Sequence, residues 1–208
     1  LRWGVLGASK FAIEHLTPAI QLARNNSFKA LASSSKEKAA AFVQLEPEIE
    51  IYRSYEELLA DDRINAVYIP LPNTMHVDWT IRAIKSGKHV LCEKPIAMRA
   101  KEIDELIKLR NTTGLLVAEA YMIVHHPQWI KAKEIVQSGV LGDLIQVDAV
   151  FSYNNQADLE NIRNNSNMGG GGLPDIGVYT LGSVRFVTDQ EPAAIRHVDI
   201  KYENGVDV

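Results

Sequence analysis

The feature that most constrains the fold is the alternation of short apolar segments with helical segments over the first 119 residues. Helix signals separate the apolar runs, such as the capping box that starts at Ser54 and the stop at Gly87. Thr17-Pro18 fits an N-cap followed by proline at the first helical position, which predicts that the first helix is kinked or restarted there. Alternation at this spacing predicts an α/β domain, a Rossmann-type doubly wound parallel sheet over residues 1–121. Its expected strands are residues 2–7, 28–32, 48–52, 65–69, 89–91 and 115–119.

A different pattern follows from residue 122 to residue 208. We expect helices at 127–137 and 175–186, strands at 144–153 and 194–202, and an Asn-rich loop with a glycine run between them. This order predicts the start of an α+β domain with a mostly antiparallel sheet. The chain begins at Leu1 inside an expected strand and stops just after a hairpin-turn signal, so we expect a piece of a longer protein.

The composition is that of an ordinary globular protein, with 46% hydrophobic and 23% charged residues. A net charge of −4 gives no reason to expect nucleic acid or an anionic membrane as a partner. The single cysteine, Cys92, cannot form an intrachain disulfide, which suits the cytoplasm. No signal peptide or metal-ligand pattern is identified.

The first candidate site is Gly7-Ala8-Ser9-Lys10-Phe11-Ala12, a degenerate form of the dinucleotide fingerprint G-x-G-x-x-G/A. Gly7 permits the tight turn and Ala12 allows close packing of helix and strand, while Ser9 replaces the middle glycine. Amides at the helix start would then face a pyrophosphate. A plain strand–turn–helix corner is the alternative that this motif alone leaves open.

The end of the second strand bears on the choice of cofactor. An Asp or Glu there usually binds a free ribose 2′-hydroxyl. Here Ser33, Ser34 and Lys38 stand where that carboxylate would be, which favours a 2′-phosphate and therefore NADP over NAD. The same serines also suit a cap for the next helix, and both roles can hold together.

The fourth strand ends in Pro70-Leu71-Pro72-Asn73-Thr74-Met75-His76. Leu71 and Pro72 would form a stiff wall against the cofactor, and Asn73 would cap the following helix. His76 is a candidate for contact with cofactor or substrate, with a surface histidine as the alternative.

Lys94 follows the fifth strand in the sequence Glu93-Lys94-Pro95. Ligands bind outside the carboxyl ends of strands in open α/β sheets, so a lysine at this place lies over a ligand. Pro95 biases Lys94 toward an extended backbone. An ordinary surface lysine is the alternative that the tripeptide alone favours.

The glycine run leads into Asp175 and Tyr179, which are four residues apart at an expected helix start and so share one face. A carboxylate and a phenol opposite a lysine make an acid–base set, because a nearby ammonium lowers the pKa of a tyrosine. The alternative is a capping aspartate and a half-buried tyrosine.

These motifs together, in this order and spacing, resemble the glucose–fructose oxidoreductase / inositol dehydrogenase (Gfo/Idh/MocA) family. The resemblance also rests on Glu119-Ala120-Tyr121-Met122 and His126-Pro127-Gln128, and it runs through nearly the whole chain. Tyr179 resembles the branch that contains dihydrodiol dehydrogenase and D-xylose dehydrogenase. In that branch the matching lysine and tyrosine are catalytic, which implies Lys94 and Tyr179, with the family's aspartate at Asp175.

One departure from the family pattern and two rival interpretations accompany this resemblance. The family often has Tyr-Arg where this chain has Ile123-Val124, so the arginine of that pattern is missing here. The resemblance implies an NADP-dependent (or NAD-dependent) dehydrogenase for a sugar, polyol or cyclic diol that works as a homodimer or higher homo-oligomer. The rivals are a dinucleotide-binding regulator without turnover and a protein that binds another nucleotide in the same cleft.

Overall fold

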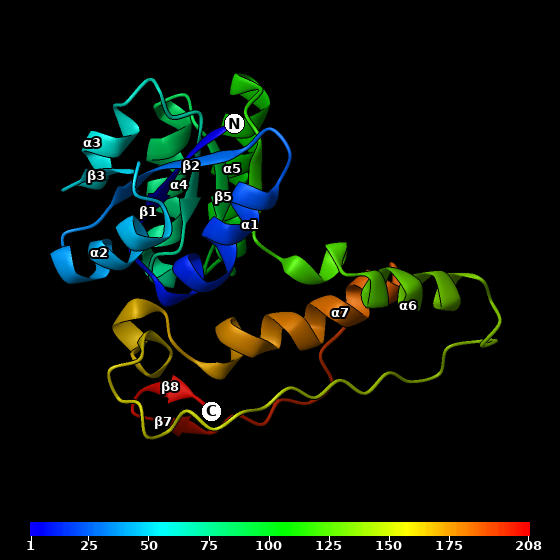
Figure 1. Ribbon diagram of the computed structural model, residues 1–208. Coiled ribbons are helices and arrows are strands. Elements are labelled where there is room, and N and C mark those ends of the chain that lie inside the picture. The colour runs from blue at the N-terminus through cyan, green and yellow to red at the C-terminus, as the bar shows by residue number, and fades with distance from the viewer. The chain divides into compact units, whose positions relative to one another are not determined.

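The computed structural model describes all of residues 1–208 and divides into two compact units, Leu1–Ala120 and Tyr121–Val208 (Figure 1). The first unit is built on six parallel strands in the order β3-β2-β1-β4-β5-β6. This order confirms the expected doubly wound α/β sheet. The strands are β1 (Arg2–Leu6), β2 (Ser27–Ala32), β3 (Glu50–Tyr52), β4 (Ala66–Ile69), β5 (His89–Cys92) and β6 (Val117–Glu119).

Helices cover both faces of this sheet, and each face has its own apolar core. On one face, Phe28 and Leu31 of β2 pack with Ile20 and Phe42 of the helices. On the other face, Val67 and neighbouring residues pack against α3 and α4, with α5 beside α4. The helices are η1 (Ala12–Leu16), α1 (Thr17–Leu22), α2 (Lys36–Leu45), α3 (Tyr55–Leu59), η2 (Asn73–Met75), α4 (His76–Lys85) and α5 (Ala100–Thr113).

The first helix restarts where the sequence predicts it. A single π turn, η1, precedes α1, and Pro18 lies at the beginning of α1. Proline has no N–H to donate to the preceding turn. Thr17 is not the expected N-cap; its buried hydroxyl donates instead to the carbonyl of Ala12 at 3.0 Å.

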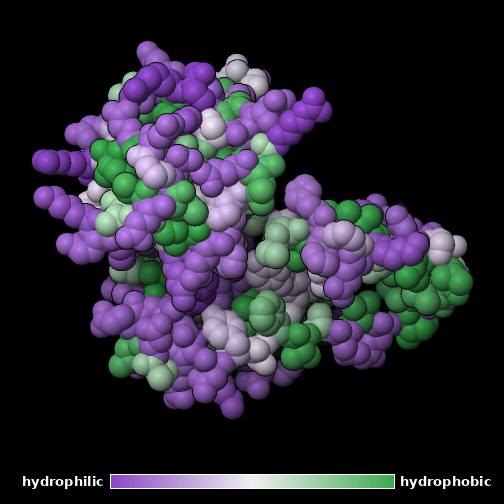
Figure 2. Space-filling model, viewed as in Figure 1, coloured by the Kyte–Doolittle hydropathy of each residue, from purple (hydrophilic) through white to green (hydrophobic).

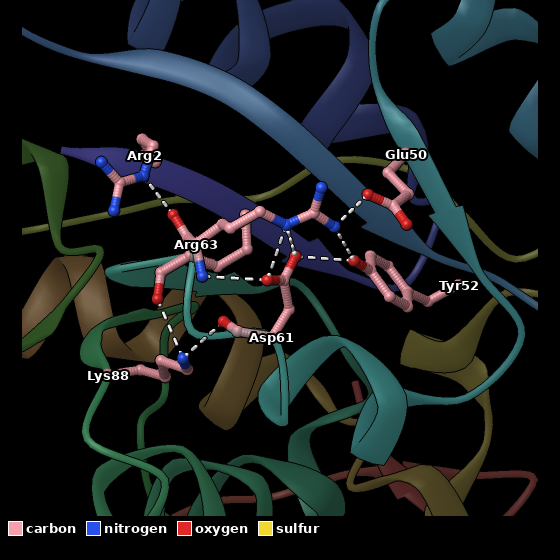
Figure 3. Close-up of polar contacts among 7 residues, drawn as sticks. Arg2, Glu50, Tyr52, Asp61, Arg63 and Lys88 are labelled. Atoms are coloured by element: carbon pink, nitrogen blue, oxygen red, sulfur yellow. Dashed lines mark hydrogen bonds and ion pairs between the residues drawn. The ribbon is translucent and has the colours of Figure 1, made fainter.

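A polar cluster ties the α3–β4 loop to the sheet (Figure 3). The hydroxyl of Tyr52 donates to Asp61 at 2.6 Å, and Arg63 Nε donates to the same carboxylate at 2.9 Å. The bond from Arg63 holds the pKa of Asp61 well below its usual range. Nearby, Lys88 Nζ donates to the carbonyls of Asp61 at 2.8 Å and Ile64 at 2.9 Å. Asp61, Arg63 and Lys88 precede β4 and β5, at the end of the sheet opposite its carboxyl edge, whereas Tyr52 is the last residue of β3.

The second unit contains the two expected helices but little of the expected sheet. α6 (Pro127–Gln137) matches its prediction, and the second helix forms as the π turn η6 (Leu173–Gly177) followed by α7 (Val178–Thr188). Its only strands are β7 (Tyr202–Glu203) and β8 (Val206–Asp207), which form an antiparallel pair. Short 3-10 turns complete the unit: η3 (Met122–His125), η4 (Ile162–Asn164) and η5 (Ser166–Met168).

The strands predicted at 144–153 and 194–202 are wrong, except for Tyr202. Their alternating apolar pattern is present, but neither segment pairs with a neighbouring strand within residues 1–208, and pairing is what makes an extended segment a strand. Large apolar side chains there are consequently open to solvent: Ile145 and Val150 are each 90% exposed, and Ile195 is 80% exposed.

Apolar surface also gathers where the chain leaves α6, and Figure 2 shows it as a green patch at the right. Val140 is 74% exposed and Leu141 is 59% exposed.

None of the helices has the length and apolar character needed to span a bilayer.

Candidate active site

The carboxyl ends of four neighbouring strands bring the first unit's candidate residues to one edge of the sheet. The parallel register places Leu6 beside Ala32 and Ile69 beside Cys92. Backbone bonds continue this alignment just past the strands, from Gly7 N to Ala32 O at 2.9 Å and from Glu93 N to Ile69 O at 3.1 Å. Helices after β1 and β4 lie on opposite faces, so this edge holds the switch point at which such sheets bind ligands.

The turn after β1 has the geometry that only glycine adopts without strain. Gly7 has φ +101°, and a Cβ at this position would lie 2.8 Å from Leu71 Cδ2 and 3.6 Å from the Tyr55 hydroxyl. Leu71 is itself buried at the end of β4, so the turn and the wall predicted opposite it are in contact. A phosphate group approaching this backbone would meet no side chain from Gly7.

The rest of the glycine motif is placed as follows. Ser9 Oγ accepts from the Ala12 amide at 3.0 Å, which caps the first turn. Ala12 is fully buried against the sheet, as close helix–strand packing requires. Lys10 and Phe11 are exposed, with Lys10 Nζ 3.8 Å from Glu14 Oε1. Ala8 is half-buried.

The serines after β2 form a local turn beside Gly7. Ser33 Oγ accepts from the Ser35 amide and lies within bonding distance of the Ser35 carbonyl, both at 3.2 Å. Ser35, rather than Ser33 or Ser34, caps α2 through the amide of Lys38 at 3.2 Å. Ser34 and the Lys38 side chain are exposed. No carboxylate replaces them at the end of this strand, since Glu37 bonds to Ser35 Oγ at 3.0 Å.

The structure changes the expectation for His76. Its side chain is fully buried, with Nδ1 2.7 Å from Pro95 O and Nε2 2.7 Å from Leu71 O. It therefore bridges two backbone segments and exposes no ring atom to a cofactor or substrate. The sequence could not show this, because neither carbonyl partner lies one helical turn away. Pro72 and Asn73, both half-buried, remain at the edge where the wall is expected.

Lys94 lies in a turn of residues Glu93 to Ile96, here called the Lys94 turn, with a cis peptide bond between Lys94 and Pro95. Glu93 Oε1 accepts from the buried Tyr68 hydroxyl at 2.6 Å, and Glu93 Oε2 accepts from the Lys94 amide at 3.3 Å. Burial, followed by the charge of Glu93, raises the pKa of Tyr68, so its hydroxyl remains a neutral donor. On the other side, Glu119 Oε1 accepts from the Ile96 amide at 2.8 Å.

In the second unit, aromatic neighbours fix the ring of Tyr179. It stacks on Tyr121 with centroids 5.6 Å apart and 25° between the ring planes, and it contacts Phe151 at 5.8 Å. The Tyr121 hydroxyl donates to the Val178 carbonyl at 2.9 Å. A Cβ on Gly182 would collide with that hydroxyl, which explains a glycine within α7. Packing thus gives the Tyr179 phenol a defined direction.

Asp175 is the centre of a small polar network that the sequence did not indicate. Its Oδ2 accepts from the Tyr153 hydroxyl at 2.5 Å and from Arg163 Nε at 2.9 Å. Burial and the bond to Asp175 raise the pKa of Tyr153 to about 12. Arg163 comes from the Asn-rich loop, and nothing in its local sequence marks it as a partner of Asp175.

The backbone of the glycine run packs closely against other segments of the same unit. A Cβ on Gly170 would overlap the carbonyl oxygen of Arg163, and Gly171 has φ +131° beside the carboxylate of Asp207. The Gly171 amide donates to Arg163 O at 2.9 Å. These glycines therefore let the 162–163 turn pack closely and hold Arg163 near Asp175.

A cavity of about 350 Å³ lies beside Tyr179 within the second unit. Its walls are mainly apolar, from Trp129, Phe151 and Val184, with the hydroxyl-bearing Thr180 and Ser183 among them. A flat or ring-shaped organic group suits such a lining.

The first unit's edge fits a dinucleotide. The side-chain-free approach at Gly7, the buried wall at Leu71 and the fixed Lys94 turn lie on successive strand ends of one sheet. Protein-family comparison agrees: a description that reads "Oxidoreductase family, NAD-binding Rossmann fold" matches residues 1–121, and a "GFO/IDH/MocA C-terminal domain" matches residues 129–207. The chain belongs to the Gfo/Idh/MocA oxidoreductase family.

Known proteins similar to this chain confirm the branch that the motifs indicate. The chain is 41% identical to "Uncharacterized oxidoreductase ORF334" of Rhizobium meliloti, over 100% of this chain and 62% of the relative. It is 35% identical to D-xylose 1-dehydrogenase (NADP(+)) 2 of Haloferax volcanii, over 89% of this chain and 56% of that protein. Dihydrodiol dehydrogenases are also among the relatives.

A solved structure is similar to this chain in fold and in sequence. KijD10, a 3-ketoreductase from Actinomadura kijaniata in complex with NADP and TDP-benzene, superimposes with a TM-score of 0.81 at 32% identity. The alignment covers 90% of this chain and 57% of that one. This chain spans about 60% of the length of the curated relatives it matches.

Proposed function

We propose that the protein is an NADP-dependent oxidoreductase that transfers hydride between the nicotinamide and a carbinol carbon of a sugar, polyol or cyclic diol. The observation that carries this proposal is the Lys94 turn, which fixes a lysine at the carboxyl edge of an NAD-binding sheet. A protein that only binds a dinucleotide has no need of a lysine held from both sides. Membership of an oxidoreductase family supports the same reading.

We propose NADP as the preferred cofactor because of the turn after β2. Ser33, Ser34 and Lys38 offer hydroxyls and an amine where a carboxylate would repel a 2′-phosphate. Gly7, Ala8 and Ser9 would hold the pyrophosphate, with Lys10, Phe11 and Ala12 in the turn that follows. Leu71, Pro72 and Asn73 would line the cofactor on the β4 side, and Glu93 would support the end near Lys94.

We propose a lysine–tyrosine acid–base pair for the chemistry. The bound nicotinamide supplies or takes the hydride. Tyr179 exchanges the proton of the substrate hydroxyl, and the Lys94 ammonium lowers the Tyr179 pKa and stabilises the charge that develops on oxygen. Asp175, held by Tyr153 and Arg163, orients the substrate.

We propose a ring-shaped polar substrate on two grounds. Relatives are named for D-xylose, a dideoxy-glucose derivative and a dihydrobenzene diol, and each of these compounds contains or can form a ring. The cavity beside Tyr179 combines aromatic walls with hydroxyl groups, as a sugar ring with one apolar face requires.

The test is turnover by the full-length protein against a panel of sugars, polyols and cyclic diols, followed by the absorbance of reduced nicotinamide. We expect oxidation of at least one member with NADP, and slower reaction with NAD. Lys94→Ala and Tyr179→Phe should each lower kcat by about 100-fold or more while NADP still binds. The matched controls Lys101→Ala and Tyr202→Phe change exposed residues and should retain activity. Tight NADP binding with no turnover of any panel member would favour the regulator instead.

A further inference from the structure

Three side chains from separate parts of the sheet edge bind the residues on either side of Lys94. One binds the Glu93 side chain and two bind main-chain groups of the Lys94 turn. Tyr68, on β4, donates to Glu93 at 2.6 Å. His76, at the start of α4, lies 2.7 Å from Pro95 O. Glu119, at the end of β6, accepts from the Ile96 amide at 2.8 Å. The residues on both sides of Lys94 are thus fixed by the surrounding fold.

Tyr68 acts on Lys94 through only one intermediate. Its side chain is fully buried, and its hydroxyl donates to Glu93 Oε1. The other oxygen of that carboxylate accepts from the Lys94 amide at 3.3 Å. A buried hydroxyl left without its partner costs free energy, so this bond sets the direction of the Glu93 side chain. Glu93 in turn holds the backbone of Lys94.

His76 supports the turn from the opposite flank. Its two ring nitrogens face the carbonyls of Leu71 and Pro95, and carbonyl oxygens only accept. A neutral ring carries hydrogen on one nitrogen, and the tautomer decides which of the two carbonyls accepts from it. His76 therefore couples the Lys94 turn to the loop after β4, where the cofactor wall is expected.

We propose that Tyr68, His76 and Glu119 are positioning residues. They hold the Lys94 amine where it can assist proton exchange by Tyr179 and stabilise the charge that develops on oxygen. This inference rests on the proposed function. A displacement of about 1 Å at a reacting group costs on the order of 100-fold in rate, so small losses of alignment are measurable. None of the three side chains needs to touch substrate or cofactor for this role.

The first test compares two phenol-to-carboxylate bonds of equal length. Tyr68→Phe removes only the hydroxyl that holds Glu93, and Tyr52→Phe removes the 2.6 Å bond to Asp61 at a different place in the sheet. We expect Tyr68→Phe to lower kcat by about 10- to 100-fold, with the NADP Kd and substrate KM within about twofold of wild type. Tyr52→Phe should lower thermal stability and leave kcat unchanged. Equal effects on kcat from both variants, or none from Tyr68→Phe, would overturn the proposal.

The second test uses rescue by a conservative change. Glu119→Gln keeps a carbonyl oxygen to accept from the Ile96 amide, whereas Glu119→Ala removes the acceptor. We expect near-normal kcat for the glutamine variant and a loss of about 10-fold or more for the alanine variant. The same loss in both variants would show that the carboxylate acts otherwise than by holding Ile96.

A third measurement does not depend on turnover, and so separates this inference from the proposed function. Hydrogen exchange of the Glu93, Lys94 and Ile96 amides reports directly on the Lys94 turn, since Pro95 has no amide hydrogen. We expect faster exchange of this segment in Tyr68→Phe and Glu119→Ala, and wild-type exchange in Tyr52→Phe. If the wild type turns over no panel substrate, the proposed function fails while this readout still tests the turn. Unchanged exchange in both variants would contradict the positioning role whatever the activity.

Discussion

Replacing Gly7 by alanine tests the turn on which cofactor binding depends. Gly7 has φ +101°, and holding a residue with a side chain there costs about 1–3 kcal/mol. The new methyl group would also lie 2.8 Å from Leu71 Cδ2, and crowding of this kind costs about 1–3 kcal/mol. We therefore expect Gly7→Ala to lower the free energy of unfolding by about 2–6 kcal/mol.

Gly87→Ala is the matched control. Gly87 follows α4, has φ +74°, and would place its Cβ with no heavy atom within 4 Å. It therefore reports the backbone cost alone, about 1–2 kcal/mol. It precedes β5, at the end of the sheet opposite the Lys94 turn, so we expect no change in NADP affinity.

The assay is urea denaturation together with an NADP titration on the folded protein. The methyl group of Gly7→Ala would press on Leu71, in the wall where we expect the cofactor, and would strain the turn that holds the pyrophosphate. We therefore expect NADP affinity to fall by about 10-fold or more, which corresponds to about 1.4 kcal/mol. Equal stability losses in Gly7→Ala and Gly87→Ala, or unchanged NADP affinity in Gly7→Ala, would refute the close approach at this turn.

Three further outcomes follow from single contacts. Asp61→Asn should lower stability by about 1–2 kcal/mol at neutral pH, since Arg63 holds the Asp61 pKa low. That contribution is present above the unfolded pKa of about 3.9 and is lost as pH falls through the lower folded pKa, so urea midpoints of wild type and variant should converge in acid. Ser33→Asp should shift the ratio of NADP to NAD affinity by about 10-fold or more toward NAD in paired titrations, because a carboxylate repels the 2′-phosphate. Burial raises the pKa of the Cys92 thiol, so a thiol-specific reagent should modify it only after unfolding; rapid labelling of the native protein would contradict its burial.

The first unit was predictable because its signals are local. Each strand is a short apolar run, and local residues mark where helices start and stop, as at Ser54 and at Gly87 with φ +74°. Parallel pairing then follows from alternation, since two parallel strands need a crossover between them. The restart at Pro18 was visible for the same reason, although Thr17, expected as the N-cap, donates instead to the Ala12 carbonyl.

The second unit was harder to predict because strands depend on distant partners. Residues 144–153 alternate as a half-buried strand should, but the pattern says nothing about which segment pairs with it. Periodicity identified α6 and α7, whose hydrogen bonds are internal to each helix. It failed at 144–153 and 194–202, where the hydrogen bonds would have to come from elsewhere.

The contrast between local signals and distant partners also explains which candidate-site residues the sequence revealed. Gly7 and Lys94 were found from motifs that carry their own geometry. The roles of Tyr68 and Glu119 could not be read from the sequence, because each is a strand residue whose partner lies in the turn after the neighbouring strand β5. His76 was noticed for its chemistry, but its burial between two carbonyls is a property of the tertiary structure.

The most direct test of the proposed lysine–tyrosine pair is a double-variant cycle. It compares kcat/KM for wild type, Lys94→Ala, Tyr179→Phe and the double variant on one active substrate with NADP. If the ammonium acts by tuning the same phenol, removing both groups should cost about as much as removing the more important one, because residues that act as a unit are not additive. Losses that multiply in the double variant would show that Lys94 and Tyr179 act independently, and would contradict the account.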